Sequence, residues 1–167
     1  MDLNGFAAHI QSSSLPHAVI CDCTASSVVS EYYEPWLRAG VHIITPNKKA
    51  NSGSLQYYYK IREAQRRLNT HFFYEANVGA GLPIISSIRD LLRTGDKFLE
   101  IEGVFSGTLS FIFNEFDGSE PFSAVVKRAK DNGYTEPDPR DDLSGMDVAR
   151  KVVILAREIG ISVELAD

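Results

Sequence analysis

The sequence predicts an α/β fold built on a parallel sheet, followed by a helix-rich α+β part. Short apolar runs alternate with helical segments over residues 1–80, which is the pattern of right-handed β-α-β units. After residue 80 the alternation of strands and helices ends, and we expect helices with one further strand. The hydrophobic fraction of 44% over 167 residues is sufficient for a real core.

The first part contains three expected strands and three expected helices. Ser26 is a suitable N-cap, and Gly40 is suited to end the helix that Ser26 begins. In chain order, we expect helix Leu3–Gln11, strand Ala18–Cys23, helix Ser26–Arg38, strand Val41–Ile44, helix Ser54–Leu68 and strand His71–Ala76.

The second part is predicted to be mostly helical. The glycines and the proline of Gly79–Pro83 suit a domain boundary, so we expect domains at residues 1–80 and 81–167. In chain order, we expect helix Pro83–Leu92, strand Phe98–Phe105 and helices Thr108–Phe116, Phe122–Asp131 and Leu143–Glu158.

Composition argues against several classes of protein. The net charge of −5 is opposite to what a nucleic-acid partner requires. No apolar run approaches the ~20 residues that span a bilayer, and no secretory signal is visible. Cys21 and Cys23 are expected to be core thiols of a strand, in a reducing, cytoplasmic compartment.

The most informative stretch of the chain is Gly133–Lys151, GYTEPDPRDDLSGMDVARK. Its two prolines predict a stiff, non-helical arm over Glu136–Arg140. Asp141 or Asp142 can then cap the helix that follows.

Asp147 and Lys151 lie four residues apart on this helix, and therefore on one face. A carboxylate and an ammonium placed in this way form either part of a polar-substrate site or an ordinary surface ion pair. Spacing alone favours the ion pair, because exposed pairs are common and weak.

The stretch resembles the characteristic segment of homoserine dehydrogenases, in which Ala and Gly precede a Pro-Asp-rich arm and then Asp-Leu-x-Gly-x-Asp-x-x-x-Lys. The matching residues are Ala129, Gly133, Pro139, Asp142, Leu143, Gly145, Asp147 and Lys151. Four other segments fit the same family in the same order: DCTAS (22–26), TPNKKA (45–50), NVGAGLP (77–83) and FSGTLSFIFN (105–114). The segment TPNKKAN and the C-terminal residues ELAD are most similar to the dehydrogenase half of bifunctional aspartokinase–homoserine dehydrogenases.

This resemblance implies a Rossmann-like, parallel-sheet nucleotide-binding part followed by an α+β substrate and dimerisation part. Residues 1–80 would be the C-terminal part of the NAD(P)-binding domain, and residues 81–167 the first part of the catalytic domain. Gly79-Ala80-Gly81 follows an expected strand, but Ile84 occupies the third glycine position of a dinucleotide loop. We therefore expect the phosphate loop upstream and the chain to be a central fragment with both parts incomplete.

The resemblance also implies an activity. The expected enzyme is an NAD(P)-dependent oxidoreductase of threonine and methionine biosynthesis that interconverts L-homoserine and L-aspartate 4-semialdehyde by hydride transfer. NADP or NAD would be the cofactor, with a sodium ion as a further ligand. The expected partners are a small-molecule substrate and other copies of the chain, without nucleic acid or membrane.

Roles for individual residues follow from the family match. Lys151 would be the proton donor, and Lys48 would face the nicotinamide end of the cofactor and the substrate. Glu136 and Asp147 would hold the homoserine amino and hydroxyl groups, while Asp142 would orient a lysine or cap the helix. Thr108 is a possible hydroxyl of the substrate pocket, although helix capping explains it adequately.

Cofactor and cation contacts complete the expected site. Thr24 and Gly133 would join Lys48 in contacting the cofactor. The resemblance assigns a monovalent cation to Glu75 and the backbone carbonyls of Val78, Ala80 and Leu82. Oxygen-only ligation suits such a hard cation, and the alternative is a hinge without an ion.

Two other functions remain open at this point. The chain could be a non-catalytic folding or assembly module of such an enzyme. A different semialdehyde dehydrogenase would require an acylatable cysteine in a loop with a histidine partner, whereas Cys21 and Cys23 are expected in a strand.

Overall fold

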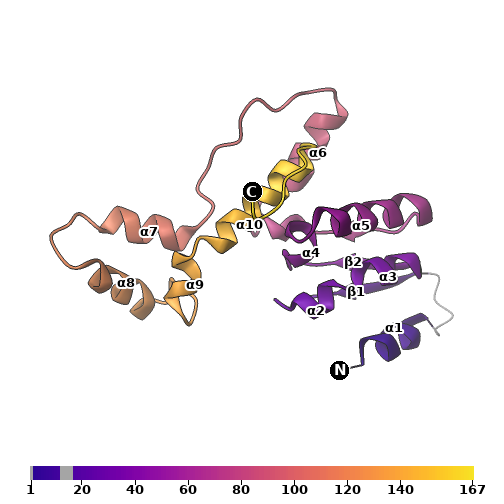
Figure 1. Cartoon of the computed structure of the whole chain (residues 1–167), viewed down its shortest axis with the longest axis horizontal. Helices are drawn as coiled ribbons and strands as arrows, with labels where there is room; N and C mark the ends of the chain where they lie inside the picture. Colours follow the sequence, from indigo (N-terminus) through magenta and orange to yellow (C-terminus); the bar gives the residue numbers. More distant parts are fainter. Residues whose placement is uncertain (1, 12–16) are drawn as a thin grey trace. The chain divides into compact units, whose positions relative to one another are not determined.

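The computed structural model describes residues 2–11 and 17–167, which form two compact units (Figure 1). The first unit comprises Met1–Lys97 and Val153–Asp167, and the second comprises Phe98–Val152. Helix α10 (Met146–Glu158) contributes residues to both. The predicted domain division between residues 80 and 81 stays a prediction. Among the described residues, no helix combines the length and apolar character that crossing a membrane requires.

The first unit is built on a parallel sheet of β1 (Ala18–Cys21), β2 (Val41–Ile44) and β3 (Phe72–Phe73), in that order. This confirms the predicted α/β class. β1 and β3 are shorter than predicted, because the chain turns at the carboxyl end of each strand. The carboxylate of Asp22 accepts a hydrogen bond from the backbone N–H of Thr24 after β1, and a 3₁₀ helix, η1 (Glu75–Asn77), follows β3.

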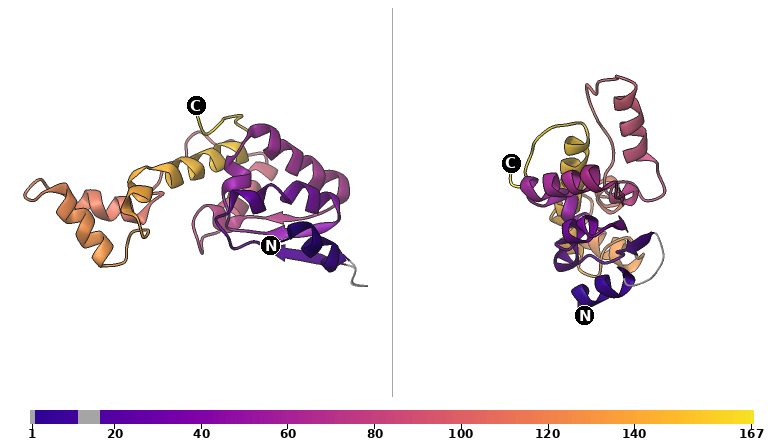
Figure 2. Two further views of the ribbon diagram at one scale, coloured as in Figure 1. Left: turned by 60° about the horizontal axis from the view of Figure 1, so that its bottom comes forward. Right: turned by 90° about the vertical axis from the view of Figure 1, so that its right-hand side faces the viewer.

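Helices cover one face of this sheet. The register pairs Ile20 with Ile43 and Ile43 with Phe72, and this row is buried. Helix α3 (Tyr33–Arg38) packs on β2 and on helix α5 (Leu55–Leu68), as Figure 2 shows. The side chains of the alternate row point away from these helices. Those of Val19, Cys21, Ile44 and Phe73 are exposed, and that of His42 is half-buried.

The two cysteines fall outside the core, so their prediction as core thiols was wrong. Cys21 lies in the exposed row beside Ile44, on the face that the helices leave open. Cys23 lies in the loop after β1. The error arose because a period of two places every second strand residue on the opposite face.

The single helix predicted over Ser26–Arg38 is interrupted. It consists of α2 (Ser27–Ser30) and α3, with Ser26 as the expected N-cap of α2. Pro35 accounts for the break, because its ring cannot donate a hydrogen bond to the carbonyl of Glu31 and would clash with that carbonyl in a continuous helix.

The other helices of the first unit agree closely with prediction. Ser54, expected as the first residue of this helix, is its N-cap and accepts a hydrogen bond from Tyr57 N at 3.2 Å. One short helix, α4, was missed. The remaining bounds are Leu3–Gln11 for α1, Lys49–Ser52 for α4 and Ile84–Arg93 for α6.

The second unit has its own small core between α7 (Gly107–Glu115) and α8 (Phe122–Asp131). Ile112, Val125 and Ala129 are completely buried there. The predicted strand Phe98–Phe105 is irregular, which is a correction. No described strand pairs with it, and Leu99 is 98% exposed, so neither a ladder nor burial stabilises an extended strand.

Two helices replace the one predicted over Leu143–Glu158. Helix α9 (Pro139–Leu143) precedes α10, and Gly145, with φ of +68°, separates them. The prediction of a non-helical arm over Glu136–Arg140 was therefore wrong at its end, because proline is favoured at the first position of a helix. Asp138, rather than Asp141 or Asp142, caps α9.

The sheet register predicts that neighbouring isoleucines of β2 differ in their contribution to stability. Ile43 is completely buried and Ile44 is 44% exposed. Ile43→Ala should lower the free energy of unfolding by about 2–5 kcal/mol, because it leaves a cavity in the core. Ile44→Ala, which removes the same atoms, should cost clearly less. Urea unfolding of the 167-residue chain measures both, and equal losses would contradict the register.

Candidate functional site

A buried polar cluster lies where β1 and β2 end. Tyr33 donates a hydrogen bond to Asp22 Oδ2, and Asn47 Nδ2 donates to the same oxygen at 3.1 Å. Thr45 Oγ1 donates to the Asp22 carbonyl at 2.7 Å and accepts from Asn47 N at 2.9 Å. These four side chains hold the carboxyl edge of the sheet together after the strands stop.

The charge states in this cluster are fixed by its hydrogen bonds. Burial by itself would raise the pKa of Asp22, but hydrogen bonds from Tyr33, Thr24 and Asn47 outweigh burial and lower the pKa. Burial, together with its bond to Asp22, raises the pKa of the Tyr33 hydroxyl well above its ordinary value. The pair is therefore a carboxylate and a neutral phenol.

The same cluster shapes the two loops that carry the predicted cofactor contacts. Asp22 Oδ1 accepts from Thr24 N at 2.8 Å, and Asn47 Oδ1 accepts from Lys49 N at 3.0 Å. Lys48 is the N-cap residue of helix α4, and its carbonyl accepts a hydrogen bond from Ser52 N at 2.9 Å. Thr24 and Lys48 thus follow neighbouring parallel strands, at the edge where α/β sheets bind ligands.

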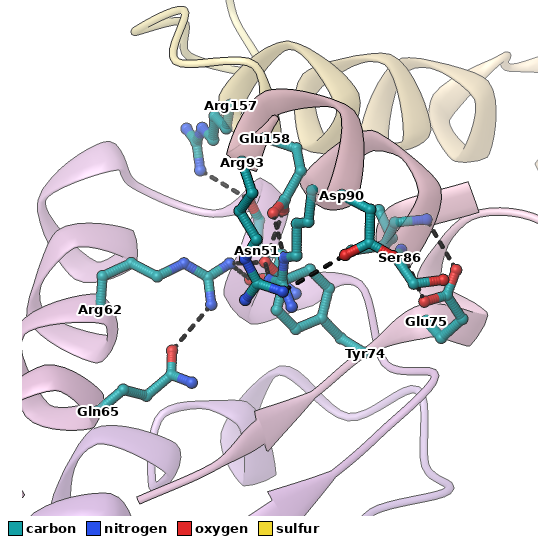
Figure 3. A network of polar contacts seen from close by, with 12 residues as sticks. Asn51, Arg62, Gln65, Tyr74, Glu75, Ser86, Asp90, Arg93, Arg157 and Glu158 are labelled. Carbon is teal, nitrogen blue, oxygen red and sulfur yellow. Dashed lines mark hydrogen bonds and ion pairs between the residues drawn. The ribbon is translucent and has the colours of Figure 1, made fainter. Parts of the chain in front are cut away.

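The predicted cation segment follows β3 and forms a turn rather than an extended stretch. Gly79 and Gly81 have φ of +72° and +78°, and Leu82 N donates to the Gly79 carbonyl at 3.0 Å. The carboxylate of Glu75 lies at the start of α6 (Figure 3), where its two oxygens accept from Ile85 N at 2.7 Å and Ser86 N at 3.0 Å.

The ligand set proposed for a cation is only partly open. The Glu75 carboxylate is engaged with α6, and the Leu82 carbonyl accepts from Ile84 N at 3.0 Å. The segment still offers the carbonyl oxygens of Val78 and Ala80, and carboxylate or carbonyl oxygens that already accept one hydrogen bond keep a second lone pair. This oxygen-rich chemistry fits a hard monovalent cation.

In the second unit, Lys151 is held on two sides. Its Nζ donates to Asp147 Oδ2 at 2.8 Å and to the Phe105 carbonyl at 2.7 Å. The Lys151 side chain is 19% exposed, against 52% for Asp147. The i,i+4 pair predicted from spacing is therefore present, and the second contact, with the Phe105 carbonyl, distinguishes it from a freely solvated surface pair.

The acidic arm places a carboxylate in the open. Asp142 Oδ2 accepts from Glu136 N at 2.8 Å and so fixes the backbone of Glu136. The Glu136 side chain is exposed, and its carboxylate has no hydrogen-bond partner within residues 2–11 and 17–167. Asp142 thus supports the arm, and Glu136 presents a free anionic group.

Thr108 and Gly133 have local structural roles. Thr108 Oγ1 donates to the Tyr134 carbonyl at 2.6 Å, which ties α7 to the start of the arm. Ser106, rather than Thr108, caps α7. Gly133 has φ of +75° and ends the α8 turn, a conformation that favours glycine.

The predicted residues therefore lie in two groups, one in each unit. Thr24, Lys48 and the Glu75–Leu82 segment belong to the first unit, and the remaining predicted residues, from Thr108 to Lys151, belong to the second. Sequence reasoning missed the buried supports Asp22, Tyr33 and Asn47. An Asp directly after a buried strand, and an Asn after Pro46, are the turn signals that could have indicated two of them.

No group of three or more His, Cys, Asp or Glu side chains in the described part of the chain is arranged to hold a metal ion.

Comparison with protein families divides the chain into two segments. Residues 1–75 match the family model described as "Homoserine dehydrogenase, NAD binding domain", and residues 83–167 match the one described as "Homoserine dehydrogenase". Among curated proteins, the chain is 60% identical to bifunctional aspartokinase/homoserine dehydrogenase 2 of Zea mays, named as chloroplastic, over 99% of this chain and 18% of that protein. It is 50% identical to the homoserine dehydrogenase of Schizosaccharomyces pombe, over 98% of this chain and 45% of that protein.

Two solved structures are also similar to this chain in fold. A Candida auris protein of unknown function superposes with a TM-score of 0.90 at 44% identity, covering 98% of this chain and 47% of that one. A hyperthermophilic archaeal homoserine dehydrogenase in complex with NADPH superposes with a TM-score of 0.75 at 27% identity, covering 84% of this chain and 43% of that one. The chain thus spans less than half the length of these relatives and neighbours.

Asp138, the N-cap residue of α9, is expected to titrate at an unusually low pH. Hydrogen bonds from Arg140 lower the pKa of Asp138 from 3.8 to about 2. The capping contribution of the carboxylate is therefore fully present above pH 3.8 and is lost as the pH falls through about 2. Carboxyl NMR of Asp138 should show this midpoint. Arg140→Met should return it most of the way towards 3.8, and an unchanged midpoint in that variant would contradict the assigned cause.

Proposed function

The chain belongs to the homoserine dehydrogenase family, and we propose that the protein containing it interconverts L-homoserine and L-aspartate 4-semialdehyde with NAD(P). This proposal rests on the arrangement of Lys151 on α10, where Asp147 and the Phe105 carbonyl hold its ammonium group. The arm with the open Glu136 carboxylate precedes it in the sequence. This arrangement lies in the segment that matches the catalytic family model.

In this proposal Lys151 moves the proton. When bound, the nicotinamide cofactor supplies a hydride to the aldehyde carbon or accepts one from the alcohol. The substrate oxygen then gains or loses a proton. An ammonium has three N–H donors, and Asp147 and the Phe105 carbonyl take two of them. The third donor is aimed by these contacts and serves the substrate oxygen as the general acid.

Carboxylates recognise the amino-acid end of the substrate. The open Glu136 carboxylate is suited to the substrate ammonium, because a charge-assisted hydrogen bond is the strong kind. Asp147 serves two groups in the proposal, since it holds Lys151 and also faces the substrate hydroxyl. Asp142 acts through Glu136 by fixing its backbone, and Thr108 secures the loop from which the arm begins.

Thr24, Lys48 and Gly133 are the proposed cofactor contacts. Thr24 and Lys48 follow neighbouring parallel strands, the position expected for a dinucleotide in a domain that matches the NAD-binding family model. Glu75 with the carbonyls of Val78, Ala80 and Leu82 is the proposed sodium site. A bound cation would draw on the free lone pairs of this turn.

The cellular setting forms a further part of the proposal. We infer a homo-oligomeric, cytoplasmic enzyme that acts on a small molecule. The plant relatives are named as chloroplastic and bifunctional with aspartokinase. The dehydrogenase activity of those proteins is the part proposed for the protein that contains this chain.

Lys151→Ala should lower kcat by about 10²–10⁴, the usual scale for loss of a general acid, with little effect on cofactor affinity. Lys127→Ala is the matched control, because Lys127 is also in an i,i+4 ion pair but is 75% exposed. A homoserine-dependent absorbance assay of the reduced cofactor measures both variants. Near-normal turnover in the Lys151 variant would remove this residue from the mechanism.

Glu136→Gln should raise the KM for homoserine by about tenfold or more, since a hydrogen bond to a charged group contributes roughly 1.5–3 kcal/mol. The KM for the cofactor should change little. Glu63→Gln on α5, where Glu63 pairs with Arg67 at 2.8 Å, is the control for loss of a surface carboxylate. A rise in the cofactor KM without a rise in the homoserine KM would show that Glu136 has been assigned to the wrong ligand.

A further inference from the structure

Two completely buried asparagines connect the loop after β2 with the segment after β3. Asn51 lies on α4 and Asn77 ends η1, and neither has any exposed surface. Asn51 Nδ2 donates to Asn77 Oδ1 at 2.9 Å. Buried amides are costly unless both of their ends are hydrogen-bonded, so this contact needs further partners.

The further partners complete a chain of hydrogen bonds, called the relay below, in which each side chain donates to the next from Arg62 to the Thr45 carbonyl. Arg62 Nη2 donates to Asn51 Oδ1 at 3.2 Å, as Figure 3 shows. Asn51 then donates to Asn77, and Asn77 Nδ2 donates to the Thr45 carbonyl at 3.0 Å. Each amide therefore uses its oxygen as an acceptor and its nitrogen as a donor, and neither can be rotated without loss of a bond.

The beginning of the relay is firmly anchored. The Arg62 guanidinium lies 4.5 Å from the ring centroids of both Tyr58 and Tyr74, and it also donates to Gln65 Oε1 at 3.0 Å. Arg157 Nη1 donates to the Asn51 backbone carbonyl at 2.8 Å. Asn51 is thus held through both its side chain and its backbone, from α5 and from α10.

The relay holds the segment that carries Lys48 from both sides. Thr45 precedes Lys48 by three residues and Asn51 follows it by three. Asn77 contacts both of them through one side chain. We propose that Asn77 is a positioning residue that fixes the place of Lys48. This inference rests on the role of Lys48 in the proposed function.

The size of the effect follows from how strictly a reacting group must be placed. An uncompensated carbonyl at Thr45 or a freed Asn51 would let the turn between them shift, and Lys48 lies in this turn. Displacement of a positioned group by about 1 Å can cost on the order of 100-fold in rate. We therefore expect loss of the Asn77 donor to lower kcat/KM by about 10- to 100-fold.

Asn77→Asp is the sharpest variant, because it keeps the shape and the acceptor for Asn51 but places an oxygen against the Thr45 carbonyl. Leu37→Ala is the control for general destabilisation, since Leu37 is a completely buried apolar residue of α3. Asn51→Asp is the second variant in case the first does not fold. It keeps the acceptor for Arg62 and removes the donor to Asn77.

The experiment measures kcat and KM below the unfolding temperatures of all variants, in the protein that contains this chain. Asn77→Asp should lower kcat/KM by about 10- to 100-fold, whereas Leu37→Ala should leave kcat/KM close to that of the wild type. In a Lys48→Met background, Asn77→Asp should have little further effect, because residues that act through one another are not additive. Equal kinetics of the Asn77 and Leu37 variants, or full additivity with Lys48→Met, would overturn the proposal.

A second readout separates this proposal from the proposed function. Labelling of Lys48 with an acetylating reagent, followed by mass spectrometry, should be faster in Asn77→Asp than in Leu37→Ala if the turn has shifted. This measurement does not require activity. Equal labelling rates would overturn the positioning role. A wild-type protein without homoserine-dependent turnover would overturn the proposed function instead.

Discussion

The structure of the first unit depends on side-chain hydrogen bonds that continue the sheet beyond the ends of its strands. β1 and β2 have four residues each and β3 has two, so the backbone ladder alone is short. Asp22, Thr45 and Tyr74 follow the strands and are nearly completely buried. Their polar groups must be paired, and among the described residues Thr70 Oγ1 is the buried side-chain atom left without a hydrogen-bond partner. The hydrogen bonds that pair these polar groups at the carboxyl edge of the sheet also fix the loops where ligands are expected.

Helix α10 joins this buried framework to the proposed chemistry. Its first turns carry Asp147 and Lys151, and its last turns carry Arg157 and Glu158. The Arg157 guanidinium is completely buried, where burial lowers its pKa, and it is satisfied by carbonyls and by Glu164 at 3.0 Å. The same helix therefore carries the lysine of a partly exposed ion pair and an arginine whose guanidinium is completely buried.

Much of this arrangement could be predicted from the sequence, because periodicity and turn residues act locally. The alternation of strands and helices along the first unit, the cap Ser26 and the pairing of Asp147 with Lys151 all follow from short-range rules. The prediction of a strand over Phe98–Phe105 was wrong, because an extended segment forms a strand only when a neighbouring strand pairs with it. The buried supports were missed for a related reason.

Hydrogen bonds between Asn51 and Asn77, or between Tyr33 and Asp22, join residues that are distant in sequence. No local pattern distinguishes such an asparagine or tyrosine from an exposed one. Lys151 shows the intermediate case. Its contact with Asp147 could be predicted from spacing, whereas its contact with the Phe105 carbonyl, 46 residues away, could not.

The neutral phenol of Tyr33 has a consequence for how a rate–pH profile of this protein is interpreted. The raised pKa of Tyr33 and the lowered pKa of Asp22 keep both groups in one protonation state from mildly acidic to strongly alkaline solution. Burial likewise raises the pKa of Tyr74, at the centre of the cluster formed with Arg62 and Arg89. These three groups of the scaffold therefore keep one protonation state in the range where enzymes are assayed. An inflection in that range therefore reports on groups other than Tyr33, Asp22 and Tyr74.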